Sequence, residues 1–345
     1  MSVFSRDKFR LNYFNRFVLT IHVLVLFIAY SIFLNRVFTP TQIPYFNFVS
    51  IGYPIIFVFV VLFLLYWLVV SWRHFFIFLL LSIGTLHPIY LSYPLINLEK
   101  ENSIAPNLSV MTFNTHGFRA DGTKDLIENN LTDVMLFQEA RKHSQKKWKK
   151  EKLNNYYSEY YDVLTFHSKY PIIQTQRIES IDSENGEAAY VDIDLGYDTI
   201  RIINIYMEPM YIDKALVKDV INSDTTEEME VSSKKIENKL VKGMKIHQKQ
   251  IESLQDFFKE SPHPILVASD MNSTPGSYEY EQLTKYFTDS FIQVGEGNGT
   301  TFHGFKFPIR IDYLFHSKHF EVTDAKVIRK KFSDHFPVII NYKLN

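Results

Sequence analysis

The chain has 345 residues, a formal net charge of −1 and no cysteine. The absence of cysteine excludes disulfide bonds, thiolate metal sites and a cysteine nucleophile. The near-zero net charge disfavours tight nonspecific binding to nucleic acid, because such binding depends on neutralising many phosphates, although a local basic patch stays compatible with it. Hydrophobic residues make up 46% of the chain while the mean hydropathy is only −0.10, so the apolar residues are unevenly distributed.

Three long apolar runs occupy the N-terminal part of the chain, at residues 17–34, 51–70 and 75–93. Each is close to the roughly 20 residues that are needed to cross the hydrocarbon core of a bilayer. A buried core helix would explain one such run, but not three in succession. The first run is too long for a removable signal peptide and lacks a small-residue cleavage site. We therefore expect residues 1–100 to form an integral, multi-pass membrane anchor with three transmembrane helices in the lipid bilayer.

The positions of Lys and Arg near the three runs predict the orientation of the anchor. Cations before the first run and between the second and third outnumber those at the other two positions. The first group is Arg6, Lys8, Arg10, Arg16 and Arg73, and the second is Arg36 and Lys100. The larger group is expected on the cytoplasmic side, which places the part after residue 100 outside the cytoplasm. We expect the two histidines within the runs, His22 and His87, to be neutral and hydrogen-bonded.

From about residue 108 the pattern changes to short β-type runs separated by turns and helices. Some runs alternate in polarity, and others are continuously apolar, as in strands covered on both faces. The expected strands are residues 108–113, 134–137, 161–166, 188–195, 199–206, 265–268, 311–315 and 336–342. The clearest helix is 234–259. The acidic segment 210–233 is expected to be a surface loop, either merely solvated or acting as a flap beside a substrate. This mixture predicts a two-sheet α/β domain over residues 101–345, with helices outside.

Polar side chains stand at the ends of several of the expected strands. These residues are Asn114, Glu139, Asp270, Asn272, Asp312, Asp334 and His335. Taken singly, a polar residue that closes a strand is usually a turn former or a cap. Together, these residues provide hard oxygen ligands suited to Mg²⁺ or Mn²⁺, two amides and one imidazole. The set therefore indicates a metal-assisted reaction at the ends of the strands.

The order of these polar blocks resembles the endonuclease/exonuclease/phosphatase superfamily, which includes pancreatic-type deoxyribonuclease. The matching blocks are residues 111–114 (MTFN), 137–139 (FQE), 168–172 (SKYPI), 269–275 (SDMNSTP), 310–313 (RIDY) and 333–337 (SDHFP). The resemblance covers about residues 108–345. It implies an α/β (α+β) fold, a four-layer α/β sandwich of the DNase I-like type, in which two sheets pack face to face between helices. The active site would lie at one rim of the sheets.

The resemblance also implies metal ligands and phosphate-binding residues. Glu139 matches the metal-binding glutamate of the family, and Asp334 matches a further residue on the metal side. Asn114 matches the asparagine that helps to position the metal ion and the substrate phosphate. The cofactor implied by this match is Mg²⁺ or Mn²⁺.

The remaining matches imply a catalytic group. Asp270 would orient or deprotonate the attacking water, and Asn272 would bind the scissile phosphate. His335 would bind the phosphoryl group and stabilise its growing charge, while Asp312 would hold the His335 imidazole in orientation. Such a group, with a divalent cation, can hydrolyse a phosphate ester without a covalent enzyme intermediate.

The chain departs from the family pattern in two blocks. Many members carry a histidine where this chain has Tyr206, within residues 204–209 (NIYMEP). A phenol donates a hydrogen bond to phosphate but does not become cationic near neutral pH, so we count Tyr206 among the catalytic residues only as a donor. The usual Gly-Asp-Phe-Asn block is Ser269-Asp270-Met271-Asn272 here, which keeps both polar residues.

Six further histidines of the soluble part are expected to be structural or at the surface. They are His116, His143, His167, His263, His303 and His319. His116 is the strongest exception, because it follows Asn114 by two positions.

The sequence thus predicts a membrane-anchored, divalent-metal-dependent phosphoester hydrolase: a phosphodiesterase, nuclease or phosphatase in which water attacks the ester. Its substrate could be nucleic acid, a phospholipid headgroup or an inositol phosphate. The alternative is a catalytically inactive, membrane-anchored binding module with the same fold. The presence of Glu139, Asp270 and His335 argues against that alternative, and the sequence indicates no protein partner.

Overall fold

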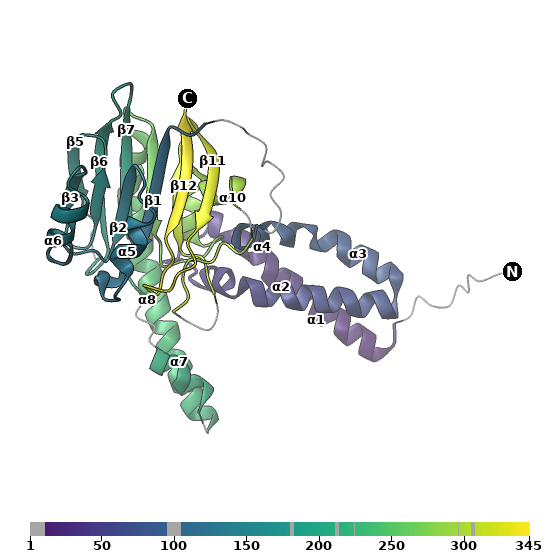
Figure 1. Cartoon of the computed structure of the whole chain (residues 1–345). Coiled ribbons are helices and arrows are strands. Elements are labelled where there is room, and N and C mark those ends of the chain that lie inside the picture. The colour runs from purple at the N-terminus through teal and green to yellow at the C-terminus, as the bar shows by residue number, and fades with distance from the viewer. Residues whose placement is uncertain are drawn as a thin grey trace.

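Two packed β-sheets flanked by helices form one end of the molecule, and a bundle of apolar helices extends from them (Figure 1). The computed structural model of the chain describes residues 11–94, 105–179, 183–210, 214–223, 225–295, 297–304 and 308–345. The boundary expected at residue 100 lies outside the described residues. So do four of the cations that enter the topology argument, Arg6, Lys8, Arg10 and Lys100.

The N-terminal bundle consists of long helices that are almost entirely apolar. Its elements are α1 (Tyr13–Ser31), η1 (Ile32–Arg36), α2 (Tyr45–Val70), α3 (Trp72–Ser82), η2 (Ile83–Thr85) and α4 (Leu86–Ser92). Among the described residues, three helical stretches are long and apolar enough to cross a membrane: Tyr13–Arg36, Tyr45–Val70 and Trp72–Ser92. Phe27, Val69 and Leu80 are among their exposed side chains, each at least 69% accessible. Apolar surface of this kind suits a lipid environment.

The ends of the apolar helices differ from the expected ends. The second helix begins at Tyr45 and only Ser71 separates it from α3, so the starts expected at residues 51 and 75 are too late. The third stretch is interrupted by the 3₁₀ turn η2, because Pro88 has no N–H to bond the carbonyl of Gly84. Inside the bundle, His22 Nδ1 accepts a hydrogen bond from Trp67 Nε1 at 3.1 Å, as expected of a hydrogen-bonded histidine.

The rest of the described chain forms two six-stranded mixed sheets. The first has the strand order β11-β12-β1-β2-β4-β3, and the second has the order β5-β6-β7-β8-β10-β9. Their strands are β1 (Leu108–Asn114), β2 (Val134–Gln138), β3 (Tyr157–Tyr160), β4 (Thr165–Ser168), β5 (Ile172–Ile178), β6 (Glu187–Asp194), β7 (Thr199–Tyr206), β8 (Ile265–Asp270), β9 (Thr288–Asp289), β10 (Asp312–His316), β11 (Phe320–Val327) and β12 (Val338–Leu344). Each sheet holds one parallel pair at its centre, β1 with β2 and β7 with β8.

Helices cover the outer face of each sheet. They are η3 (His116–Phe118), α5 (Thr123–Glu128) and α6 (Lys142–Lys152) beside the first sheet, and α8 (Thr226–Lys259) and α9 (Tyr278–Leu283) beside the second. Helix α7 (Lys214–Ile221) packs against α8 and extends away from the sheets, and α10 (Ser290–Val294) contacts β10 of the second sheet and β11 of the first. One apolar core fills the space between the sheets. A second lies under α8 and α9, and a third lies under α5 and α6. The layers are helix, sheet, sheet and helix, so the predicted four-layer α/β fold is confirmed.

Three of the expected elements in this part are wrong. The segment 210–233 contains α7 and the first turns of α8 instead of a loop. The start of α8 is capped by Thr225, whose side chain accepts from the Glu228 N–H at 3.2 Å, a Thr-x-x-Glu signal hidden in acidic sequence. The strand expected at 161–166 is replaced by β3 and β4 with a turn between them. The last strand starts only at Val338, because Pro337 has no N–H for the ladder.

Candidate active site

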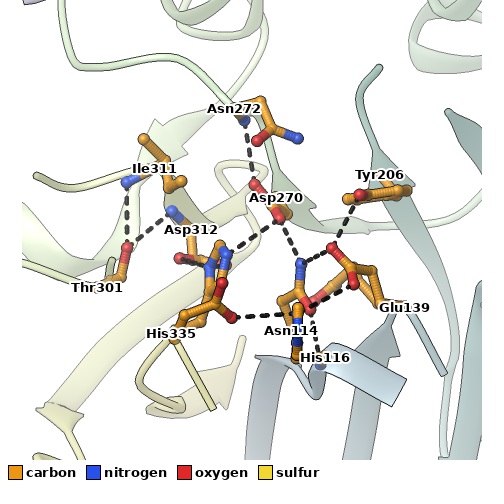
Figure 2. A network of polar contacts seen from close by, with 12 residues as sticks. Asn114, His116, Glu139, Tyr206, Asp270, Asn272, Thr301, Ile311, Asp312 and His335 are labelled. Carbon is orange, nitrogen blue, oxygen red and sulfur yellow. Dashed lines mark hydrogen bonds and ion pairs between the residues drawn. The ribbon is translucent and has the colours of Figure 1, made fainter. Parts of the chain in front are cut away.

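The two parallel strand pairs deliver polar side chains to one rim of the sheets (Figure 2). Asn114 is the last residue of β1, and Glu139 directly follows β2. In the second sheet, Tyr206 ends β7 opposite Asp270, which ends β8. Because strands of a parallel pair end at the same edge, each sheet contributes two polar residues, and the packing of the sheets brings the four together.

Asn114 connects the two sheets within this cluster. Its Nδ2 donates to Glu139 Oε1 at 3.0 Å and to Asp270 Oδ2 at 2.8 Å. Its Oδ1 accepts from the His116 backbone N–H at 3.0 Å, and the residue is buried. In this arrangement the side chain of Asn114 fixes the distance between two carboxylates that come from different sheets. Its predicted role as a metal ligand stays a prediction.

A more open group of side chains surrounds Glu139. Tyr206 donates its hydroxyl to Glu139 Oε1 at 2.9 Å. His116 Nδ1 lies 3.5 Å from Glu139 Oε2 and 3.5 Å from Asp334 Oδ1. The side chains of Glu139 and Asp334 are about one-third exposed, at 32% and 36%. Their carboxylates therefore face both solvent and each other across the imidazole of His116.

A buried group of side chains lies on the other side of Asn114. His335 Nδ1 contacts both carboxylate oxygens of Asp312, at 3.0 and 2.9 Å. Its Nε2 lies 3.9 Å from Asp270 Oδ2. Asp312 pairs with Asp270 across β10 and β8, so the two carboxylates are neighbours through the strand register. Although these three residues are close enough to be considered a metal site, Asp312 occupies Nδ1 and Asn114 contacts Asp270, an arrangement typical of an oriented imidazole.

Burial and charge shift the titration of this group in opposite directions. Burial, together with the negative charge of Asp312, raises the pKa of Asp270 to about 7. Burial alone would lower the pKa of His335, but the carboxylates of Asp312 and Asp270 outweigh it and raise that pKa to about 10. Near neutral pH the site thus combines an imidazolium with a carboxyl group that exchanges its proton.

The backbone at this rim is strained. Within the described part of the chain, the non-glycine residues with positive φ are His116 (46°), Phe118 (54°), Glu139 (50°) and Asn272 (48°). Such angles are uncommon for residues with a Cβ, and they gather at functional sites when the surroundings hold them in place. The N–H of Asn272 donates to Asp270 Oδ1 at 3.1 Å, and its Nδ2 donates to the Met207 carbonyl at 2.9 Å. Three of these four residues, His116, Glu139 and Asn272, belong to the cluster, whose hydrogen bonds and ion pairs hold them in these conformations.

The predicted site residues lie together at this rim, and His116 lies among them. Asn114, Glu139, Tyr206, Asp270, Asn272, Asp312, Asp334 and His335 all belong to the connected set of contacts described above. His116, which the sequence marked only by its distance from Asn114, lies between two of its carboxylates. By contrast, His167 is buried between Ser158 and Gln145, in keeping with a structural role.

The chemistry of the donor set fits a divalent cation. The cluster holds four carboxylates, from Glu139, Asp270, Asp312 and Asp334, against the imidazoles of His116 and His335. Oxygen ligands of this type suit Mg²⁺ or Mn²⁺, and a bound cation would offset the excess negative charge. The partly exposed pair Glu139 and Asp334 is the side of the cluster that a cation can reach from solvent.

A model of the endonuclease/exonuclease/phosphatase family matches residues 111–335. The chain belongs to this family. Endonuclease/exonuclease/phosphatase proteins are in general phosphoester hydrolases, and they typically use divalent metal ions. A second model, of a domain of unknown function, matches residues 15–91, and no curated protein sequence matches the chain.

Solved structures share the fold of this chain over about two-thirds of its length. An endonuclease/exonuclease/phosphatase from Bacteroides vulgatus is 16% identical with a TM-score of 0.52, covering 69% of this chain and 99% of that one. A humanized D. rerio TDP2 is 14% identical with a TM-score of 0.50, covering 68% and 98%. A conserved protein of unknown function from Enterococcus faecalis is 15% identical with a TM-score of 0.50, covering 69% and 100%. At these identities the likeness shows the fold alone.

Proposed function

We propose that the chain is a membrane-anchored, divalent-metal-dependent phosphoester hydrolase in which water attacks phosphorus. The observation that carries this proposal is the link that Asn114 makes between Glu139 and Asp270, which joins an exposed acidic pair to a buried Asp–His–Asp group. Hydrolysis of a phosphate ester needs a base that activates water, and positive charge that offsets the charge growing on the phosphoryl oxygens. The buried group can supply the base and an imidazolium, and the exposed pair can hold a metal ion.

Asp270 is proposed to take the proton of the attacking water. Its carboxylate lies at the end of β8, where Asn114 and the Asn272 N–H each hold one oxygen. Burial and Asp312 raise its pKa to about 7. A base with a pKa near the working pH combines a sizeable deprotonated fraction with a useful proton affinity.

His335 is proposed to stabilise negative charge on the phosphoryl group. Asp312 contacts its Nδ1 through both oxygens, which fixes the ring and directs Nε2 towards the space beside Asp270. Asp312 and Asp270 keep the imidazole protonated by raising its pKa to about 10, against the effect of burial. A preorganised cation in a buried site stabilises a growing oxyanion more strongly than the same cation does in water.

Glu139 and Asp334 are proposed to hold Mg²⁺ or Mn²⁺, with Asn114 and Tyr206 fixing the position of Glu139. When bound, such an ion supplies positive charge to the phosphoryl oxygens and polarises the ester. Asn272 is proposed to border the phosphate. This proposal is supported by the hydrogen bond from the Asn272 N–H to Asp270 Oδ1, which places Asn272 next to the proposed base.

A basic pocket beside the site supports a substrate with several phosphates. The pocket has a volume of about 910 Å³ and begins two residues after Glu139. Its cationic side chains are Arg141, Lys142, Lys146 and Arg177, and Arg177 is paired with Asp162, which also lines the pocket, and with Glu187. Helix α6 lies on the side of the sheets away from the apolar bundle (Figure 1). Of the three substrate classes, this position favours nucleic acid over a phospholipid headgroup held in the bilayer.

The orientation of the bundle is proposed on charge. Arg16 and Arg73 lie at the end of the bundle that is remote from the sheets, and Arg36 lies at the near end, where it contacts Glu281 of α9. Under the positive-inside rule, the remote end faces the cytoplasm, so that the catalytic part is extracytoplasmic.

The test uses the full chain in detergent or lipid nanodiscs with Mg²⁺ or Mn²⁺. Single-stranded DNA, double-stranded DNA, RNA, sphingomyelin and phosphoinositides are offered as substrates. We expect metal-dependent release of product, fastest with a polynucleotide. Preference for a lipid would reject the substrate class, and no turnover of any ester would favour the inactive binding module.

A further inference from the structure

The apolar bundle contacts the catalytic part through buried polar groups at the end nearest the sheets. Asn35 Nδ2 donates to the Gly276 carbonyl at 2.8 Å, and Ser50 Oγ accepts from Thr274 Oγ1 at 3.3 Å. Both catalytic-side residues belong to the loop that follows Asp270. The membrane helices are thus in direct contact with the segment that carries Asp270 and Asn272.

Asn47, near the start of α2, is the centre of this contact. Its Oδ1 accepts from the Tyr278 backbone N–H at 2.7 Å, and its Nδ2 donates to Glu279 Oε2 at 3.1 Å. Tyr278 is the first residue of α9, where helix N–H groups lack partners within the helix. Asn47 therefore provides a partner for the start of α9 and for a buried carboxylate.

From Glu279 the contacts continue towards the active site. Glu279 Oε1 contacts His247 Nδ1 at 3.0 Å, and His247 Nε2 contacts the Glu208 carbonyl at 2.7 Å. Asn47, Glu279 and His247 are all buried, at 2%, 0% and 0% exposure. Buried polar groups of this kind are costly to leave without partners, so each one constrains the next.

The last step joins this path to the catalytic loop. Glu208 follows Met207, whose carbonyl accepts from Asn272 Nδ2 at 2.9 Å and whose N–H donates to the Asp270 carbonyl at 2.9 Å. A continuous path of contacts therefore runs from Asn47 through Glu279, His247 and the backbone at 207–208 to the residues that flank the proposed base.

Steric contact adds a second constraint on the same loop. Gly276 has a φ of +80°, and a Cβ at this position would lie 2.7 Å from Ile32 Cδ1 of η1. The loop after Asp270 is therefore pressed against the end of the first apolar helix. Asn272 belongs to the same loop, and its positive φ is an uncommon conformation that needs support from the surrounding structure.

We propose that Asn47 is a positioning residue for the loop of Asp270 and Asn272, so that the membrane helices complete the active site as well as anchoring it. This inference rests on the proposed function. It predicts that contacts made by α2 set the rate of the chemical step, because a displacement of about 1 Å in a catalytic group can reduce turnover about 100-fold.

The first test is Asn47→Ala in the full chain, in detergent, with bis(p-nitrophenyl) phosphate and Mn²⁺. We expect kcat to fall about 10- to 100-fold with little change in KM. The matched control is Tyr90→Phe, which removes an anchor contact to the Ile292 carbonyl, at the same interface but away from the loop. Its kcat should equal that of the wild type.

A charge swap tests the path without removing atoms. Asn47→Asp places a carboxylate against Glu279 and should reduce kcat as strongly as Asn47→Ala. Adding Glu279→Gln lets the new amide donate to the carboxylate introduced on α2 while its oxygen still faces His247, so the double variant should recover most of kcat. A purely structural defect in α2 would not be repaired by this second change.

Hydrogen exchange gives a readout that does not depend on turnover. The amides of residues 271–274 and 276 should exchange faster in Asn47→Ala than in the wild type, and Tyr90→Phe should leave them unchanged. Equal kcat and equal exchange in Asn47→Ala and the wild type would overturn the positioning role while leaving the hydrolase intact. Absence of turnover in the wild type itself would instead overturn the proposed function and this inference with it.

Discussion

The Nε2 atom of His335 lies 3.9 Å from Oδ2 of Asp270, where β8 ends. The separation exceeds a hydrogen bond, so the two groups interact through charge while both face the same space (Figure 2). The antiparallel pairing of β10 with β8 produces this relationship, because it places Asp312, the partner of His335, directly opposite Asp270. In the proposed mechanism, Asp270 at the end of β8 and His335, held by Asp312 of the adjacent strand β10, would thus act on one phosphate.

Asp312→Asn tests what the contact with Asp312 contributes to the function of His335, because the imidazole itself is kept. The amide keeps the size of the side chain but removes the charge that holds the imidazole protonated through Nδ1. By analogy with other oriented imidazoles, we expect kcat to fall by about 10²- to 10⁴-fold. Steady-state kinetics measure the change, and thermal unfolding checks that the fold is kept. A variant with near-normal kcat would remove Asp312 from the mechanism.

Glu139→Gln should weaken metal binding in particular. The variant keeps the volume of the side chain but removes one of the two partly exposed carboxylates beside His116. We expect the affinity for Mn²⁺, measured by electron paramagnetic resonance or calorimetry, to fall about 10- to 100-fold. Glu128→Gln is the matched control, because Glu128 contacts Trp148 and Lys152 on the outer face of the first sheet. Equal Mn²⁺ titrations for Glu139→Gln and the wild type would reject Glu139 as a ligand.

The dependence of kcat/KM on pH should show two limbs. Asp270 must be deprotonated to accept a proton, and because its pKa is raised to about 7, activity should fall as the pH drops below that value. His335 must be protonated, and its pKa of about 10 places the second limb at alkaline pH. Asp312→Asn removes a carboxylate that raises the His335 pKa, so it should move the alkaline limb to lower pH. A flat profile between pH 5 and pH 9, about two units either side of the Asp270 value, would contradict these assignments.

The basic pocket should matter for large anionic substrates only. Arg141→Ala combined with Lys142→Ala removes two cations from its lining. We expect kcat/KM for an oligonucleotide to fall, with a weaker dependence on salt, while turnover of bis(p-nitrophenyl) phosphate is unchanged. Lys318→Ala combined with Lys326→Ala is the control, because both side chains are exposed and outside that lining. Equal losses on both substrates would indicate damage to the site instead of a lost anion contact.

The cluster could be predicted from the sequence because each of its residues stands in a short block that can be recognised on its own. Asn114, Glu139 and Asp270 each close a buried strand, and parallel pairing brings such ends to one rim. The long N-terminal helices were equally visible as apolar runs. The start of α8 was missed because its Thr225–Glu228 cap lies in a polar segment that resembles a loop. The hydrogen bond from Asn47 to Glu279 joins residues far apart in sequence, and no local sequence pattern predicts such a contact. The strained φ of His116 likewise appears only in three dimensions.

The central claim is that Asp270 activates water for attack on a phosphate ester. The most direct test compares the full-length wild type with Asp270→Asn on bis(p-nitrophenyl) phosphate, in the same detergent and at the same Mn²⁺ concentration. We predict metal-dependent turnover by the wild type and a kcat at least about 10³-fold lower for the variant, with similar thermal unfolding. Equal turnover by both proteins, or none above the buffer blank by either, would contradict the account.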